Sequence, residues 1–238
     1  MAISQKYGRT YHYPFSPGTE SDDRIQHNYW TYLQQLPMIV HTEKLDGENN
    51  CLSRYGVFAR SHAAPTTSPW TETIRMFWHR IKNELGTLEI FVENLYAVHS
   101  IEYRDLDHHF YVFGIRDRDQ WLGWEETKFY ANLLDLPVVP DISIGKPLTD
   151  QRAFENEVKT LAAGSGAFMP HDAKDGKPVT MEGIVTRSWH GYPVTKFEEH
   201  VFKYVRRGHV KTDQHWTRHW RRAKLKNEGG KNVDDHKQ

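Results

Sequence analysis

The feature that most constrains the fold of this chain is a series of short apolar runs interspersed with longer amphipathic segments. Runs of about four to eight apolar residues are typical of strands, and apolar residues at helical spacing are typical of helices. Because the helices do not alternate regularly with the strands, the pattern predicts an α+β domain with a mixed, largely antiparallel sheet. We expect strands at 37–41, 51–60, 88–95, 110–115, 181–187 and 200–205, and helices at 68–85, 124–134 and 149–163.

The ends of the chain are expected to differ from this pattern. Residues 1–36 show neither the apolar runs of strands nor the spacing of helices, and they are predicted to be irregular. Residues 212–226 have the spacing of a helix, which Gly229 and Gly230 would end.

Composition excludes several classes of protein. The chain has 238 residues, enough for one sizeable domain or one domain with a short appendage. Its only cysteine, Cys51, excludes an internal disulfide framework and fits a reducing compartment. No stretch approaches the roughly 20 apolar residues of a membrane span, and the N-terminus lacks the apolar core of a signal peptide. We therefore expect a cytoplasmic protein that does not enter a membrane.

Charge is distributed unevenly, although the formal net charge is zero. Between Lys203 and Lys231 there are ten Lys or Arg residues and two acids, Asp213 and Glu228. A basic segment of this kind, with Trp residues among the cations, is typical of phosphate and nucleic-acid contact. A solvated basic helix is the alternative interpretation.

Residues 43–47, Glu-Lys-Leu-Asp-Gly, form the motif with the clearest chemical meaning. A Lys-x-Asp-Gly string is the nucleophile motif of covalent nucleotidyltransferases, in which the lysine amine attacks the α-phosphate of a nucleotide. A free lysine has a pKa near 10.4, so a site must favour its neutral form through burial, a nearby cation or a metal. Without further motifs, Lys44 would be interpreted as a solvated surface lysine.

Charged residues recur where later strands are expected. Glu93 and Glu182 each interrupt an apolar run, and a carboxylate there is costly unless it faces a site. Two or more acids near one phosphate indicate Mg²⁺, or Mn²⁺ in its place, because such cations prefer oxygen ligands.

Taken together and in order, the motifs resemble the ATP-dependent RNA ligases, in particular the branch typified by RNA ligase 2 of phage T4. The resemblance covers residues 43–207. It consists of Lys-Leu-Asp-Gly at 44–47, Glu-Asn-Leu-Tyr at 93–96, Phe-Gly-Ile at 113–115, Glu-Gly-Ile-Val at 182–185 and Lys-Tyr-Val-Arg at 203–206.

This resemblance implies roles for residues near the nucleotide base and sugar. Glu43 would accept a hydrogen bond from the adenine amino group, Phe113 would stack on adenine, and Glu93 would hold the ribose hydroxyls. Arg60 would clamp ribose or phosphate. The alternatives are a strand-edge acid for Glu43, a core side chain for Phe113 and an ordinary polar strand residue for Arg60.

Other implied roles concern the phosphates. Glu182 would bind the metal, Asn49 would serve the phosphate and metal-water region, and Lys203 would neutralise charge on the phosphates. Asn49 as an ordinary strand residue is the alternative. The family pattern has a second lysine two positions after Lys203, where this chain has Val205. Arg206, Arg207 or Lys196 would have to supply that charge.

The implied reaction is the sealing of RNA ends through a lysine–AMP intermediate and an adenylylated 5′-phosphate, which a 3′-hydroxyl then attacks. The expected organisation is a nucleotidyltransferase (adenylation) domain at 1–207 and a basic helical tail at 208–238, without an OB-fold. We expect a monomer that acts on RNA breaks such as a nicked duplex or a broken tRNA, with the tail contacting RNA.

Three other functions compete with this one. The same fold can use GTP to cap or guanylylate, or can persist as a non-catalytic RNA-binding protein. A histidine-based metal hydrolase is the third, since His215 and His219 have metal-ligand spacing on the expected tail helix.

Overall fold

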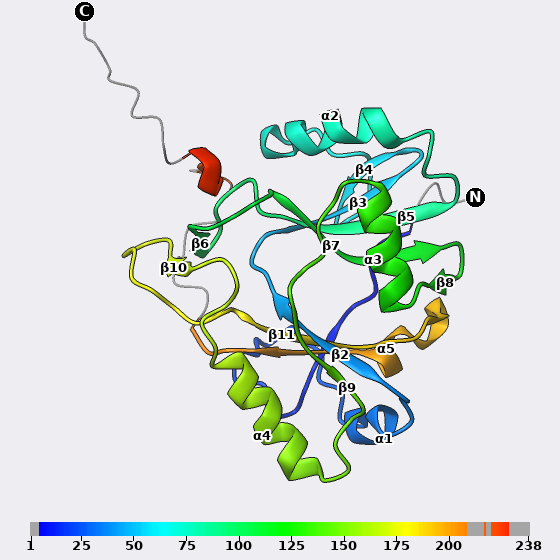
Figure 1. The fold of residues 1–238 in the computed structure, drawn as a ribbon, viewed down its shortest axis with the longest axis vertical. Helices are drawn as coiled ribbons and strands as arrows, with labels where there is room; N and C mark the ends of the chain where they lie inside the picture. Colours follow the sequence, from blue (N-terminus) through cyan, green and yellow to red (C-terminus); the bar gives the residue numbers. More distant parts are fainter. Residues whose placement is uncertain (1–4, 209–216, 218–219, 229–238) are drawn as a thin grey trace, which may run out of the picture.

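The computed structural model describes residues 5–208, 217 and 220–228, and two β-sheets form its centre (Figure 1). The larger sheet has six strands in the order β12-β8-β7-β5-β3-β4, and every neighbouring pair is antiparallel. In chain order these strands are β3 (Glu48–Ser53), β4 (Gly56–Ala59), β5 (Leu88–Asn94), β7 (Phe110–Asp117), β8 (Gln120–Trp121) and β12 (Tyr192–Pro193).

The second sheet has five strands in the order β1-β13-β11-β2-β9. Its strands are β1 (Tyr11–His12), β2 (Ile39–Lys44), β9 (Asp141–Gly145), β11 (Gly183–Ser188) and β13 (Val201–Val205). Only the short β1 is parallel to its neighbour, β13. A two-stranded ribbon joins β6 (Ile101–Tyr103) to β10 (Pro170–Asp172). The expectation of an α+β domain with largely antiparallel sheets is confirmed.

Helices cover the outer faces of the two sheets (Figure 1). In the described part of the chain, the α-helices are α1 (Tyr29–Leu33), α2 (Glu72–Ile81), α3 (Trp124–Leu133), α4 (Gln151–Ala162) and α5 (Phe197–His200), and 3₁₀ turns lie at η1 (Pro69–Thr71), η2 (Val194–Lys196) and η4 (Lys226–Glu228). Helices α2 and α3 pack on the six-stranded sheet, and α1 and α4 pack on the other. Among the described residues, no helix has the length and apolar character needed to cross a bilayer.

Strands β5 and β7 of the six-stranded sheet carry apolar side chains on both faces, and both of these faces are covered. In β5, Ile90 and Val92 pack toward the cluster that includes α2 and α3, whereas Phe91 lies in the cluster between the sheets. This alternation places successive side chains of one strand in different cores. The cluster between the sheets borders the site described below.

The three helices expected between residues 68 and 163 are present, with ends that differ by a few residues. The segment 68–85 begins with the 3₁₀ turn at Pro69 and continues as α2, although the Ser68 side chain does not cap it. Within residues 1–36, the described part from residue 5 onward is more regular than expected, since it contains β1 and α1. Strands β6, β8, β10 and β12 have two or three residues each, too few to show a period.

The tail differs from the helix expected at 212–226. Seven of the fifteen residues of that segment, including His215 and His219, lie outside the described residues, but residues 220–225 form no helix, so the helix prediction is wrong there. The backbone N–H of Val98 donates to Arg221 O at 2.9 Å, and the N–H of Ala223 donates to Tyr96 O at 2.8 Å. Ala223 is also buried. These tertiary contacts replace the hydrogen bonds of a helix and outweigh local propensity.

Candidate active site

A cavity of about 500 Å³ lies against both sheets. All but one of the site residues predicted from the sequence line it, namely Glu43, Lys44, Asn49, Arg60, Glu93, Phe113 and Lys203. The exception, Glu182, is buried behind Lys44 and bonds to it. The structure therefore brings together residues that are up to 160 positions apart in the chain.

Lys44 ends strand β2 and pairs with Gly183, the first residue of β11. Its Nζ lies 2.7 Å from Glu182 Oε2. Burial lowers the pKa of Lys44, but the carboxylates of Glu182, Glu93 and Asp46 outweigh burial and hold that pKa above its ordinary value. The amine is therefore protonated here, whereas nucleophilic attack requires the neutral form.

The turn after Lys44 is held by hydrogen bonds from distant segments. Asp46 Oδ2 accepts the backbone N–H groups of Ser100 and Ile101, both at 2.8 Å. Gly47 N–H donates to Glu93 Oε1 at 3.0 Å. A Cβ at Gly47 would lie 2.6 Å from Asn94 O, so this glycine permits a close approach to β5.

Three acids around this turn have raised pKa values because they are buried. Burial raises the pKa of Glu43 and of Asp46 to about 7 and that of Glu93 to about 8. The negative charge of Glu182 adds to the effect at Asp46 and Glu93. Strongly perturbed acids that share a cavity mark a candidate functional site.

Two buried oxygen atoms at the cavity have no hydrogen-bond partner among the described residues. One is Glu43 Oε1, whose companion Oε2 accepts the N–H of Ala167 at 2.7 Å. The other is Asn49 Oδ1, on β3 opposite Glu93. Buried polar atoms are normally bonded, so these two oxygens are suited to bonds with a bound molecule.

Lys203 reaches the cavity from β13 and contacts Asp23. Its Nζ lies 3.2 Å from Asp23 Oδ1. Burial and the charge of Lys44 lower the pKa of Lys203, while Asp23 opposes that shift. The basic residues considered as substitutes for a second lysine do not line the cavity: Lys196 pairs with Glu199, and Arg206 Nε donates to Met181 O.

Phe113 and Arg60 occupy different parts of the cavity. Phe113 is buried on β7, with its ring 4.9 Å from that of Tyr7. It therefore belongs both to the core and to the cavity wall. Arg60 follows β4 and is exposed at the cavity.

Sequence analysis missed several residues at the cavity, among them Tyr7, His99 and Arg187. Arg187 is buried on β11 and joins the two sheets, since Nη1 donates to Phe113 O and Nη2 donates to Thr42 Oγ1. A charged residue within a mostly apolar run is the same pattern that marked Glu93, so Arg187 could have been predicted from the sequence in the same way. Tyr7 lies in a segment without periodicity, so no local signal marks it.

The donor groups fit a cation that takes only part of its coordination from protein. Among the described residues, no three His, Cys, Asp or Glu side chains converge on a metal position. Mg²⁺ commonly takes one or two carboxylates, phosphate oxygens and several waters. Glu182, together with the unpartnered Asn49 Oδ1, provides oxygen donors of that kind.

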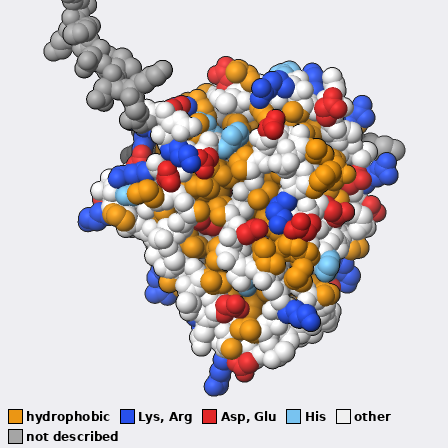
Figure 2. Space-filling view, in the orientation of Figure 1, with side chains coloured by type: hydrophobic (Ala, Val, Ile, Leu, Met, Phe, Trp, Pro, Cys, Tyr) orange, Lys and Arg blue, Asp and Glu red, His pale blue; other side chains and the backbone are white. Residues whose placement is uncertain are grey.

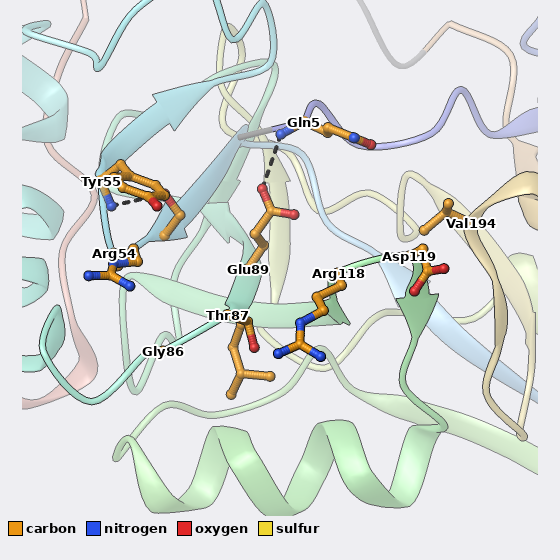
Figure 3. Close-up of a pocket in the computed structure, with 11 residues that line it drawn as sticks. Gln5, Arg54, Tyr55, Gly86, Thr87, Glu89, Arg118, Asp119 and Val194 are labelled. Atoms are coloured by element: carbon orange, nitrogen blue, oxygen red, sulfur yellow. Dashed lines mark hydrogen bonds between the residues drawn. The ribbon is translucent and has the colours of Figure 1, made fainter. Parts of the chain in front are cut away.

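A second cavity, of about 410 Å³, lies toward the other ends of β3 and β5. Figure 3 shows Arg54 and Tyr55 on one side of it, Arg118 and Asp119 on the other, and Glu89 bonded to Gln5 between them. Its charges are mixed and largely exposed, and it holds no buried lysine. We therefore assign the chemistry to the cavity at Lys44.

Three basic residues at the described end of the tail are paired within the chain. Arg221 bonds to Glu102 at 2.6 Å, Arg222 bonds to Glu228 at 2.5 Å, and Lys226 bonds to Asp107. On the face shown in Figure 2, cationic and anionic side chains are likewise interspersed. The described surface therefore shows mixed charge on this face.

Comparisons with known proteins bear on the family and the fold of the chain. The family model described as RNA ligase matches residues 37–205, and no curated protein sequence matches the chain. A Naegleria gruberi RNA ligase variant with AMP and Mn is 18% identical, with a TM-score of 0.50, over 75% of this chain and 53% of that one. A variant of the same ligase with ATP and Mn is also 18% identical, with a TM-score of 0.51, over 82% and 57%.

A further variant of that ligase, in its apo form, is 18% identical, with a TM-score of 0.53. The alignment covers 85% of this chain and 59% of that chain. The present chain therefore spans between half and three fifths of the Naegleria ligase. At this level of identity the likeness establishes the fold.

Proposed function

Since this chain belongs to the RNA ligase family, we propose that it is an ATP-dependent RNA ligase that works through a covalent Lys44–AMP intermediate. The observation that carries the proposal is the Lys44 amine, bonded to Glu182 at 2.7 Å at the edge of a cavity large enough for a nucleotide. ATP and a divalent cation are proposed as cofactors, because the Naegleria ligase was solved with ATP and Mn.

Lys44 is the proposed nucleophile. Its ammonium group must lose a proton before it can attack the α-phosphate, and Glu182 Oε2 is the nearest proton acceptor. Attack forms the Lys44 Nζ–P bond as the bond to pyrophosphate breaks. A divalent cation bound at Glu182 would withdraw charge from the α-phosphate during this displacement.

Other residues of the cavity would bind and orient the nucleotide. Glu43 Oε1 would accept the adenine amino group, and Glu93 would bind the ribose hydroxyls. Phe113 would pack against the base. Lys203 would lie against the phosphates and neutralise their charge. Because phosphoryl transfer requires little covalent chemistry from protein, this positioning and charge neutralisation would supply most of the rate.

RNA ends are the proposed substrates of the later steps. The AMP on Lys44 would pass to the 5′-phosphate of one RNA end, and the 3′-hydroxyl of another end would then displace AMP and close the phosphodiester. The first of these displacements breaks the Lys44 Nζ–P bond and returns Lys44 to its free amine, and the second releases AMP from the adenylylated RNA end. The family match supports RNA as the substrate class.

Mass spectrometry of the intact protein tests the first step. Incubation with ATP and Mg²⁺ should add one AMP to the wild-type chain, and the Lys44→Ala variant should gain nothing. Chelating the cation should prevent the adduct. Lys224→Ala, at a lysine outside the cavity, is the matched control and should be labelled like wild type. Labelling with GTP alone would replace this proposal with a guanylyltransferase, and no adduct with any nucleotide would overturn it.

A further inference from the structure

We infer that Asp23 is a positioning residue for Lys203, and that His12 holds Asp23 in place. The inference rests on the proposed function, since Lys203 matters only if it meets the phosphates. It concerns a part of the chain that lies before the family match at 37–205. It also accounts for the N-terminal segment, in which no local pattern indicated a role.

The carboxylate of Asp23 bridges two buried or half-buried side chains. Oδ1 lies 3.2 Å from Lys203 Nζ, and Oδ2 lies 3.1 Å from His12 Nε2. The side chain of His12 is 1% exposed, and those of Lys203 and Asp23 are 19% and 22% exposed. Because Lys203 and Asp23 are largely shielded from water, the attraction between their charges is stronger than that of an exposed pair.

The contacts form a closed loop that returns to the strand carrying Lys203. His12 Nδ1 bonds to Ser16 Oγ at 2.9 Å, and Ser16 Oγ accepts the backbone N–H of Val205 at 2.9 Å. Val205 and Lys203 both belong to β13. The loop from Lys203 through Asp23, His12 and Ser16 therefore leaves Asp23 little freedom to move relative to β13.

Backbone pairing fixes the same segment. Strand β1 lies parallel to β13 with His12 opposite Lys203, and Tyr13 N–H donates to Lys203 O at 3.0 Å. His12 N–H donates to Arg24 O, and Gln26 N–H donates to His12 O, both at 2.8 Å. These bonds join the segment that contains His12 to the segment that follows Asp23. Backbone hydrogen bonds therefore fix the chain next to the Asp23 carboxylate.

The charges explain why an acid is needed at this position. The groups that act on Lys203 are Lys44, Glu182, Asp23 and His12. Burial and the charge of Lys203 lower the pKa of His12 to about 4, so His12 is neutral at pH 7. Asp23 therefore offsets the repulsion that Lys44 exerts on Lys203, and it keeps the Lys203 ammonium charged and at the cavity wall.

The test compares Asp23→Asn with Asp22→Asn. Both changes remove one negative charge from adjacent positions, but the Asp22 side chain is 83% exposed and does not contact Lys203. We measure the single-turnover rate of AMP transfer to Lys44 between pH 6 and pH 9, together with thermal unfolding. At pH 8, Asp23→Asn should transfer AMP roughly tenfold more slowly than wild type, and Asp22→Asn should stay within twofold.

The pH profile separates positioning from a general loss of structure. Lys203 acts in its protonated form, so removing the Asp23 charge lowers its pKa and should move the alkaline limb of the profile to lower pH. Asp23→Glu retains the charge, so it should keep the limb at the wild-type pH, while its longer side chain displaces Lys203 and slows the transfer. Should Asp23→Asn not fold, Asp23→Glu is compared with Asp22→Glu, and a slower rate in the first alone supports the inference.

Two results would overturn the inference. One is wild-type kinetics in Asp23→Asn, and the other is a slower rate with an unmoved alkaline limb. In both cases wild type would still form the adduct, so the proposed function would stand. If wild type itself forms no adduct, the proposed function fails, and the inference fails with it.

Discussion

Strands β3 and β5 border two cavities of similar size at their opposite ends, and only one of the two has the properties of a reaction site. Glu93 lies at one cavity and Glu89 at the other, four residues apart on β5, or about 13 Å at 3.3 Å per residue. Both cavities contain cations and carboxylates. Glu89 is itself only 12% exposed, but it pairs with Arg116. The comparison therefore isolates what several charges that share one shielded cavity add to the same kinds of side chain.

Burial changes the chemistry at the first cavity. There the pKa of Glu93 is raised to about 8, and Lys44 bonds to the buried Glu182. At the second cavity Tyr55 is 55% exposed, and Arg54 stacks on its ring at 5.3 Å, where water screens its charge. A cavity that accommodates a ligand is therefore a weaker indication of function than buried charges that alter one another.

The largest expected effect after Lys44 itself is at Glu182. Glu182→Gln keeps the shape but removes the charge that pairs with Lys44, and it weakens the proposed cation site. AMP transfer should slow by about 100-fold or more, the usual size for the loss of one electrostatic group at a reacting centre. Single-turnover labelling at saturating Mg²⁺ measures it.

The exposed acid Glu84, on the loop after α2, is the control for that change. Glu84→Gln should leave the rate unchanged. A rate within threefold of wild type in Glu182→Gln would show that the buried pair is not part of the chemistry, and the contrast between the two cavities would lose its strongest support.

An intermediate effect is expected on stability at Glu93. A carboxyl whose pKa is about 8 in the folded protein binds its proton more tightly in the folded chain than in the unfolded chain. Its contribution to stability is complete below the unfolded pKa, near 4.5, and is lost as pH rises through about 8. Glu43 and Asp46 have the same sign, so these three acids together should lower the free energy of unfolding from pH 5 to pH 8. The buried His12 and His41, whose pKa values are lowered to about 4, act in the opposite direction.

Glu93→Gln should make that fall less steep, because the amide does not ionise. At pH 8 the variant should be more stable than wild type by about 1 kcal/mol or more, a rise in melting temperature of about 3 °C. Thermal unfolding at pH 5, 6.5 and 8 provides the measurement. Parallel pH dependences in the two proteins would contradict the buried-acid assignment.

The smallest effect is expected at the second cavity. Tyr55→Ala and Arg54→Ala should each leave AMP transfer within twofold of wild type and stability within about 0.5 kcal/mol, as is usual for exposed side chains. The same labelling and unfolding measurements apply. A tenfold loss of AMP transfer in either variant would show that this cavity takes part in the reaction, and the distinction between the two would fail.

The residues that the sequence alone could identify are those marked by a pattern among their neighbours in the chain. Lys44 belongs to a recognisable string, Glu93 and Glu182 interrupt apolar runs, and α2 has a clear helical period. Such patterns also hold in the folded protein because they depend only on residues that are neighbours in the chain. Where the signal was weak, the prediction failed, as for the short strands and for residues 220–225, which pair with 96–98 instead of forming a helix.

The sequence by itself determined the α+β class, the family resemblance and seven of the seventeen residues that line the cavity. Only the tertiary structure decided which acids are buried, that Lys44 carries a proton beside Glu182, that Asp23 contacts Lys203, and that Arg187 lines the cavity. The physical reason is that charge state and position depend on groups distant in the chain. Lys203 and Asp23 are separated by 180 residues and meet only because β1 pairs with β13.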